Sequence, residues 1–392
     1  MKPQTLKRRC FFLLIWLLGS HSLLAQSGSD LETKLWADME DYRLDNFSHI
    51  EAAFILSGAT HPDSLNFYLS WYQQLLTTIK GFNFNPFDRV GSAAKVFSYL
   101  HGTWLLTYQE KATTLLNVVQ QKEYNCVAGT ILYNLVCQDL GWPTEAFETP
   151  THTYTIFPNF TERVMVENTT PMGFDIMKNL KEYSRYLLKF YPEKQALKIG
   201  LDRIYAYENS KGRPIDNTEL LGLLAYNRAY FAMKANDYQT AYDFVLLAQK
   251  FNKDSRSNVQ FEIDLYFRWG NKLFEEGKFY DAFEVYADAC YRYPDIKEFI
   301  HNCKAAFFNA LQNNWQSKDW KVTQQITSEI LDLEILERKD LIPLQQILQN
   351  WASYFYQIRK WEEARQVTVY LELIAPDDPQ LKVFKEALKR RN

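Results

Sequence analysis

The chain has few of the residues that several common kinds of functional site require. Its 392 residues include 14 glycines, 13 prolines, 6 histidines and 5 cysteines. No glycine-rich stretch has the pattern of a phosphate-binding loop, and no group of His, Cys and carboxylate residues has the spacing of a metal site. The sequence therefore predicts neither a cofactor nor a bound metal.

The chain also lacks a strong excess of charge of either sign. Its 44 Lys and Arg residues nearly balance its 47 Asp and Glu residues, which gives a formal net charge of -3. A protein that binds a phosphate backbone needs a basic stripe or patch, and the sequence has none. We therefore expect no nucleic-acid partner.

Long apolar runs are absent except near the N-terminus. Lys2 and the basic residues 7–9 precede an apolar run at 11–18, and this run is much shorter than the ~20 residues that span a bilayer. Basic residues, a short apolar run and then a small residue such as Ala25 are typical of a cleaved secretory signal. We therefore expect residues 1–25 to be a signal peptide, and the mature chain to be exported, periplasmic or secreted, with no membrane segment.

The next part of the chain changes from a helical pattern to a strand pattern. Residues 30–113 carry apolar side chains at spacings of three and four, with Asp63 or Ser64 and Asp88 as candidate helix caps. After Gly141 come two short segments, THTYTIF and RVMVENTT, whose composition favours strands. These features predict an α+β domain over residues 26–206 whose N-terminal part is helical.

From residue 219 onward the strands stop and an internal repeat begins. The spacing of large and small residues around Ala282 matches the consensus of a tetratricopeptide repeat, and shifts of 41 residues fall on equivalent positions. The sequence predicts four helical units over residues 219–392, preceded by a polar linker at 207–218. The four anchor positions are Ala241, Ala282, Thr323 and Ala364.

Cys126 is the cysteine best placed for chemistry. Asn125 is a good N-cap, and the apolar residues that follow have helical spacing, so Cys126 falls in the first turn of a helix. Backbone N–H groups and the positive end of the helix dipole favour a thiolate there. Cys137 lies three turns later, where we expect a core residue.

A thiolate nucleophile needs a base, and His152 opens the first predicted strand after the Cys126 helix. The next predicted strand ends in Glu167 and Asn168, and either side chain could orient the imidazole through a hydrogen bond. Candidate donors to a developing oxyanion are Gln120, Gln121 and the Cys126 backbone N–H. The sequence alone does not choose among these donors.

The segments YNCVAGTILYNLVCQDLGW, PTHTYTIF and VMVENTTP resemble the transglutaminase-like branch of the papain-type cysteine superfamily. The resemblance implies that Cys126 is the nucleophile, His152 the base and Glu167 the orienting acid, although Glu167 stands where the family more commonly has Asp. It implies acyl transfer at an amide bond, by hydrolysis or by cross-linking to an amine. The expected fold is a transglutaminase-like α+β domain followed by an all-α tetratricopeptide-type repeat array.

Two alternatives stay open at this point. The helical repeats are typical of proteins that bind a protein or peptide partner, so the chain could be an inactive scaffold that acts through its repeats. Cys290 and Cys303 lie near a predicted helix–turn–helix junction, where they could form a disulfide or stay as buried thiols.

Overall fold

The computed structural model describes residues 30–160, 164–178, 210 and 212–390. These residues divide into two compact units, one ending at Glu262 and the other starting at Ile263. The described chain is mostly helical, with two small sheets in the first unit. The predicted signal peptide lies outside the described residues, and within them no helix has the length and apolar composition to cross a membrane.

The first unit begins with helices in the region where the sequence predicts them. Asp88 caps α5 as predicted, because its Oδ1 accepts a hydrogen bond from the Gly91 N–H at 2.7 Å. Helix α4 begins before the predicted caps, at Pro62, since proline suits a first turn in which its missing N–H is not needed. The helices among the described residues of this unit are α2 (Asp30–Asp38), η1 (Met39–Asp41), α3 (His49–Leu56), α4 (Pro62–Lys80), α5 (Arg89–Thr103), α6 (Leu115–Gln121), α7 (Cys126–Asp139), η2 (Ile176–Lys178), α11 (Asn217–Lys234) and α12 (Tyr238–Phe251).

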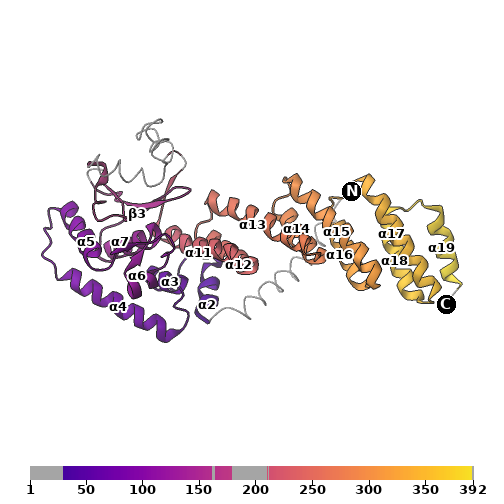
Figure 1. The fold of residues 1–392 in the computed structure, drawn as a ribbon, viewed down its shortest axis with the longest axis horizontal. Helices are drawn as coiled ribbons and strands as arrows, with labels where there is room; N and C mark the ends of the chain where they lie inside the picture. The colour runs from indigo at the N-terminus through magenta and orange to yellow at the C-terminus, as the bar shows by residue number, and fades with distance from the viewer. Residues whose placement is uncertain (1–29, 161–163, 179–209, 211, 391–392) are drawn as a thin grey trace. The chain divides into compact units, whose positions relative to one another are not determined.

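Helix α7 is the central element of this unit, and it packs against α3, α5, α11 and the sheet (Figure 1). All of its residues from Val127 to Cys137 are buried. Burial on every side requires partners for its polar side chains. Asn134 Nδ2 donates to Asn217 Oδ1 at 2.9 Å, and Asn134 Oδ1 accepts from Thr155 Oγ1 at 2.5 Å.

The larger sheet contains four antiparallel strands in the order β5-β4-β3-β6. The predicted antiparallel pair is confirmed as β4 (Thr153–Ile156) and β5 (Met165–Val166). Strands β3 (Glu145–Glu148) and β6 (Arg213–Ile215) were not predicted. A second, two-stranded sheet pairs β1 (Thr107–Tyr108) in parallel with β2 (Glu123–Tyr124).

Most of the described part of the predicted linker at 207–218 belongs to regular secondary structure. Residues 213–215 form β6, with Pro214 opposite Phe147 of β3. Because β6 is an edge strand, it tolerates a proline. Asp216 then caps α11, and its Oδ1 accepts a hydrogen bond from the Glu219 N–H at 2.7 Å.

Helices α11 and α12, which the sequence assigned to the repeat region, are part of the first unit. Leu221 and Phe251 share one apolar core with α7. Buried Glu148 on β3 also accepts hydrogen bonds from Asn252 Nδ2 at 3.1 Å and Ser255 Oγ at 3.0 Å. These contacts join the sheet to the end of α12. The division between the compact units falls between Glu262 and Ile263, inside the helix that follows the first pair.

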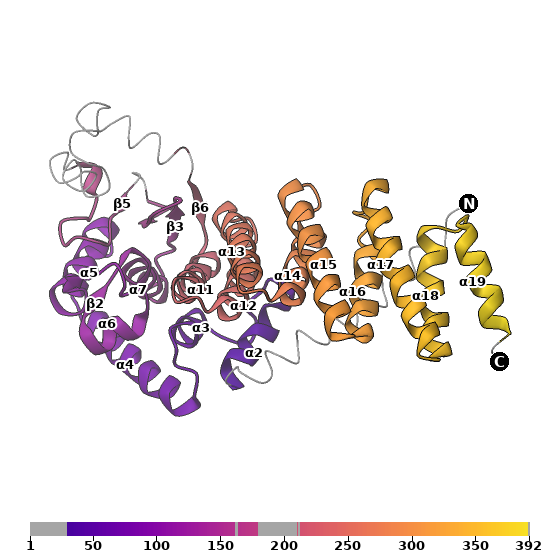
Figure 2. The same cartoon turned by 45° about the vertical axis from the view of Figure 1, so that its right-hand side comes forward.

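The predicted 41-residue helical repeat is present in the structure. The second helices of four successive pairs begin at Tyr238, Phe279, Trp320 and Trp361, each 41 residues after the last, and the four anchor residues are fully buried. In the second unit the helices follow one another as adjacent antiparallel pairs (Figure 2). Helix α13 (Arg256–Glu275) begins in the first unit and continues into the second. The other bounds are α14 (Phe279–Arg292), α15 (Lys297–Ser317), α16 (Trp320–Asp332), α17 (Arg338–Gln357), α18 (Trp361–Ile374) and α19 (Pro379–Lys389).

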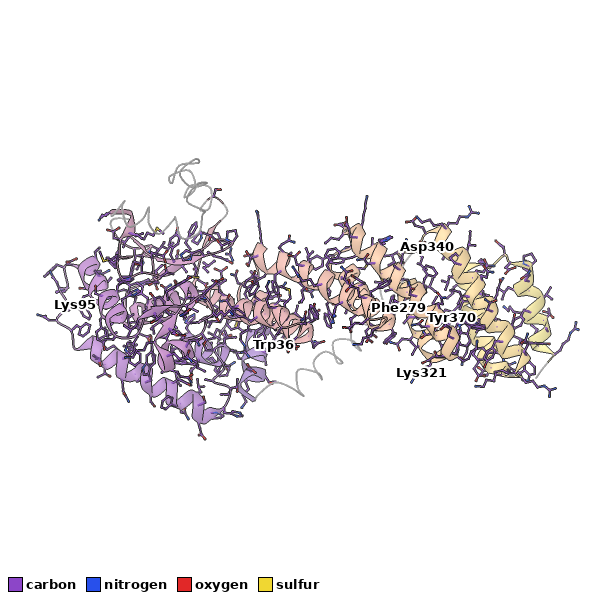
Figure 3. The ribbon with its side chains drawn as sticks, in the orientation of Figure 1. Trp36, Lys95, Phe279, Lys321, Asp340 and Tyr370 are labelled. Carbon is purple, nitrogen blue, oxygen red and sulfur yellow. The ribbon has the colours of Figure 1, made fainter. Side chains whose placement is uncertain are left out.

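A cluster of aromatic side chains lies between the third and fourth helix pairs, α15–α16 and α17–α18. The ring of buried Trp351 lies 5.0 Å from that of Trp315 and 5.4 Å from that of Trp320. Tyr370 on α18 joins the cluster, with its ring 6.4 Å from that of Trp320 (Figure 3). The packing of large rings therefore connects α15, α16, α17 and α18.

We expect Trp351→Ala to lower the free energy of unfolding of the second unit by about 3–5 kcal/mol, because the truncation leaves a large cavity. Leu373→Ala is the control: Leu373 is 68% exposed on α18, and its loss should change stability by less than about 0.5 kcal/mol. Chemical denaturation followed by tryptophan fluorescence and circular dichroism measures both. Similar effects for the two variants would contradict the packing described.

Candidate active site

Cys126 is the first residue of α7, as the sequence predicts. Asn125 caps the helix, and its Oδ1 accepts hydrogen bonds from the N–H groups of Val127 at 3.0 Å and Ala128 at 3.1 Å. The cap uses these two N–H groups rather than that of Cys126. The half-buried thiol therefore lies at the positive end of the helix dipole, beside first-turn N–H groups.

His152 lies immediately before β4, and a tight turn holds its backbone. The His152 carbonyl accepts hydrogen bonds from the Thr149 N–H at 2.8 Å and the Thr149 hydroxyl at 3.0 Å. The Cys126 thiol lies close enough to the imidazole to raise the pKa of His152. The structure therefore brings together the predicted nucleophile and the predicted base.

Glu167 completes this cluster from the end of β5. Its Oε2 lies 2.8 Å from His152 Nε2, and its Oε1 accepts hydrogen bonds from the Thr169 N–H at 2.9 Å and the Thr169 hydroxyl at 2.6 Å. The side chain of Glu167 is fully buried, and that of His152 is 8% exposed. Both carboxylate oxygens therefore have partners, which fixes the carboxylate and, through it, the imidazole ring.

Burial and pairing act in opposite directions on the two charged groups. Burial alone would lower the pKa of His152, but the charge of the Glu167 carboxylate and the hydrogen bonding with Cys126 and Glu167 outweigh burial and raise that pKa to about 10. Burial would raise the pKa of Glu167, but His152 and the Thr169 hydrogen bonds outweigh it and lower that pKa. At neutral pH the pair is therefore an imidazolium and a carboxylate.

This pair predicts how the stability of the first unit depends on pH. Since the pKa of His152 rises from 6.5 to about 10 on folding, its contribution is complete below pH 6.5 and is lost as the pH rises toward 10. Since the pKa of Glu167 falls below 4.5, its contribution is complete above pH 4.5 and is lost in more acidic solution. Urea denaturation of His152→Gln should lack the loss between pH 6.5 and 10, and an unchanged profile would contradict the assignment.

Asn168, the alternative third residue, belongs to a different set of contacts. Its Nδ2 donates to Thr155 Oγ1 at 2.9 Å and to Thr130 Oγ1 at 3.1 Å. These partners continue to Asn134, inside the core around α7. Of the two candidates, Glu167 is therefore the side chain that contacts His152.

The glutamines considered as oxyanion donors have other partners. Gln120 Nε2 donates to the Tyr68 hydroxyl at 2.5 Å. Gln121 is exposed, and its Oε1 accepts from Asn117 Nδ2 at 3.3 Å. The Cys126 backbone N–H is the remaining candidate from the sequence.

The structure adds two residues that sequence reasoning did not identify. Tyr108 on β1 pairs with Tyr124 on β2, two residues before Cys126, and the two rings lie 5.9 Å apart. Tyr108 is 41% exposed, and its partial burial and then the charges of Cys126 and Glu167 raise its pKa, so the phenol stays protonated near the cluster. Thr169 is the other residue. The only sequence feature that could have indicated it is its hydroxyl side chain two positions after Glu167.

The residues expected to belong to the core do so. Cys137 is fully buried, and burial raises the pKa of its thiol far above the usual range. His101 is buried with its ring 4.3 Å from that of Phe97, and burial lowers its pKa to about 4. Neither side chain has the setting of a nucleophile or a general base at neutral pH.

Gly173 holds the turn that presents Glu167. The Glu167 N–H donates to the Gly173 carbonyl at 2.9 Å, and a Cβ at Gly173 would lie 1.8 Å from the Glu167 carbonyl oxygen. The chain segments approach too closely for any other residue.

We therefore expect Gly173→Ala to destabilise the first unit by about 2 kcal/mol or more and to slow thiol labelling of Cys126, because Glu167 is displaced. Gly102→Ala in helix α5 is the control, since a Cβ there would meet no atom within 4 Å. The control should leave labelling unchanged and be neutral or stabilising by up to about 1 kcal/mol. A native labelling rate and stability in Gly173→Ala would contradict the role of this turn.

In the parts of the chain that the structure describes, no group of three or more His, Cys, Asp and Glu residues could hold a metal ion.

No protein-family model matches the chain, and no curated protein matches it. Among solved structures it is similar to menin, in a crystal structure described as revealing the binding site for the Mixed Lineage Leukemia protein. The identity is 11%, the TM-score is 0.32, and the alignment covers 93% of this chain and 98% of that chain. A likeness this weak assigns neither a fold nor a function.

Proposed function

We propose that this chain is a transglutaminase-like cysteine protein that transfers or hydrolyses acyl groups at an amide bond. The observation that supports the proposal is the continuous series of contacts from the Cys126 thiol to the His152 ring and from that ring to the Glu167 carboxylate. Three separate elements supply these groups: the start of α7, the residue before β4 and the end of β5. A thiol, a base and an orienting acid in this order are the parts that thiol-dependent acyl transfer needs.

The reaction follows from the protonation states of the cluster. Cys126 Sγ, as a thiolate beside imidazolium, attacks the carbonyl carbon of an amide and forms the carbon–sulfur bond of a tetrahedral intermediate. The Cys126 N–H is the candidate donor to its oxyanion. His152 then gives its proton to the departing amine nitrogen, the carbon–nitrogen bond breaks, and a thioester remains. Water or a second amine loses a proton to His152 as it attacks the thioester, which releases the thiolate.

Glu167 acts by holding the ring. Because Nε2 of His152 contacts Glu167, proton exchange with the substrate takes place through Nδ1. The buried carboxylate also stabilises the imidazolium, so the charged pair persists at neutral pH.

The helical repeats have a separate part in the proposal. We assign helices α11 to α18 to tetratricopeptide-type units that bind a protein or peptide partner. The 41-residue spacing and the burial of the small anchor residues support this assignment. Export of the mature chain is also part of the proposal, and it depends on the sequence of residues 1–25.

A second candidate function is that of a catalytically inactive interaction protein that acts through these repeats. The observation in its favour is that Gln120, one of the side chains considered as oxyanion donors, already donates its Nε2 hydrogen to Tyr68. A site without a strong oxyanion donor would activate the thiol but stabilise the transition state poorly.

Acylation by an activated ester distinguishes the two functions. We expect p-nitrophenyl acetate to release a burst of nitrophenol and to leave an acetyl group on Cys126, detected by intact mass and peptide mapping. Cys126→Ala should lose both signals, and His152→Ala should slow them. If Cys126 is alkylated rapidly but is never acylated, the site is an activated thiol without acyl-transfer activity, and the interaction protein is favoured. Adding a primary amine then separates transfer from hydrolysis.

A further inference from the structure

Two more cysteines meet inside the second unit, far along the chain from Cys126. Cys290 lies near the end of α14 and is 4% exposed, and Cys303 lies in the second turn of α15 and is fully buried. Their side chains lie close enough to interact, and this interaction raises the pKa of Cys303. Neither residue has a part in the reaction proposed above.

The packing of the two helices keeps these thiols together. Helices α14 and α15 are joined by residues 293–296 alone and pack closely along their lengths. Ala289 and Ala306, which neighbour the cysteines along their helices, are fully buried, and such small side chains allow a close approach. The thiol pair is therefore a fixed feature of this helical hairpin.

We propose that Cys290 and Cys303 are a disulfide-forming pair, which closes on reaction with a disulfide oxidant and covalently links α14 to α15. This inference is independent of the acyl-transfer site and would hold for either function considered above. The oxidant class is a small or protein disulfide, such as those that oxidise exported proteins.

The chemistry proceeds by two exchanges. Cys290 is the less buried thiol and lies within one turn of the end of its helix, so its thiolate attacks first. A mixed disulfide forms, and one thiol of the oxidant is released. Cys303 Sγ then attacks Cys290 Sγ and releases the second thiol. The two protein thiols lose two electrons, the oxidant disulfide gains them, and the two protons pass to the released thiols.

The other cysteines do not offer such a pair. Cys126 and Cys137 are eleven residues apart in the same helix, which places them about 16 Å apart along its axis. The interaction with Cys290, burial and the nearby Glu329 carboxylate all raise the pKa of Cys303. This thiol should therefore be slow toward external reagents and react mainly with the sulfur beside it.

The test uses the full mature chain with Cys126→Ser, so that the candidate nucleophile does not react with the oxidant. The protein is incubated with glutathione disulfide, quenched with N-ethylmaleimide, digested without reductant and analysed by mass spectrometry. We expect a linked peptide containing Cys290 and Cys303, and unmodified Cys137. We also expect the thermal unfolding midpoint of the second unit to rise by about 5–10 °C, reversibly with dithiothreitol, because the bond closes a short segment.

The matched control adds Cys303→Ala, which should remove both the linked peptide and the thermal shift. If that variant does not fold, the parent protein alone still decides the question. Full maleimide labelling of both cysteines after denaturation, or a glutathione adduct on Cys290 without closure, would overturn the proposal.

Discussion

Replacing His152 by alanine should slow the alkylation of Cys126 near pH 6.5 by about 10- to 100-fold. In the native protein the imidazolium of His152 lies against the thiol, and the raised pKa of His152 keeps it charged at this pH. The charge favours the reactive thiolate, whereas an ordinary cysteine with a pKa of about 8.5 has only about 1% thiolate at pH 6.5. The expected size of the effect follows from this difference in the fraction of thiolate at pH 6.5.

The measurement is the rate of carbamidomethylation of Cys126 under limiting iodoacetamide, quantified by peptide mass spectrometry. In the same samples buried Cys137 serves as an internal control and should stay unmodified in both proteins. Labelling in urea should become equal for the two proteins, because the helix terminus and the histidine are then separated. Equal native rates would mean that His152 does not activate the thiol.

Replacing Glu167 by alanine should lower the free energy of unfolding of the first unit by about 3–5 kcal/mol. Its carboxylate is fully buried and has hydrogen bonds to His152 and Thr169. Removal leaves the buried imidazole without its counter-ion and leaves two donors of Thr169 without their acceptor. The loss of stability therefore comes from the unpaired imidazole and the unpaired Thr169 donors as well as from the lost ion pair.

Glu40 supplies the matched control in the same unit. It pairs with Lys250 at 3.1 Å, but its side chain is 52% exposed. Glu40→Ala should therefore change stability by less than about 1 kcal/mol. Urea denaturation at pH 6 compares the two variants, and an effect of Glu167→Ala as small as that of Glu40→Ala would contradict the buried pair.

Much of the candidate site could be predicted because its parts have local signals. Asn125 before an apolar helical pattern fixes where α7 begins, so Cys126 could be placed in its first turn. The sequence also allowed His152 to be placed at the start of a strand, because β-branched residues follow it. The 41-residue spacing of the helix pairs was predictable, because small side chains recur where paired helices must approach closely.

The choice between Glu167 and Asn168 depends on information that the sequence does not contain. Both residues directly follow β5, and Glu167 contacts His152 whereas Asn168 contacts Thr155 and Thr130 in the core. Which residue faces which side depends on the register of β5 against β4. That register is set by tertiary packing.

The contacts around the predicted linker could not be predicted for a related reason. The segment around Pro214 has the polar and proline-containing composition of a linker, yet it pairs with β3 as an edge strand. Its partner, Phe147, lies more than sixty residues earlier, and β6 has only three residues. A strand this short has no periodicity of its own, so only the sheet reveals it. The burial of Glu148 against Asn252 likewise connects the first helix pair to the sheet through contacts distant in sequence.

The central claim is that Cys126 and His152 form a thiolate–imidazolium pair held by Glu167, and the most direct test is the ultraviolet absorbance of the thiolate. The difference spectrum between the native mature protein and Cys126→Ser should be followed from pH 4 to 10. The account predicts thiolate absorbance already at pH 6, and its loss at that pH in Glu167→Gln and His152→Ala. A difference signal that appears only above about pH 8, unchanged by either substitution, would show an ordinary cysteine and contradict the account.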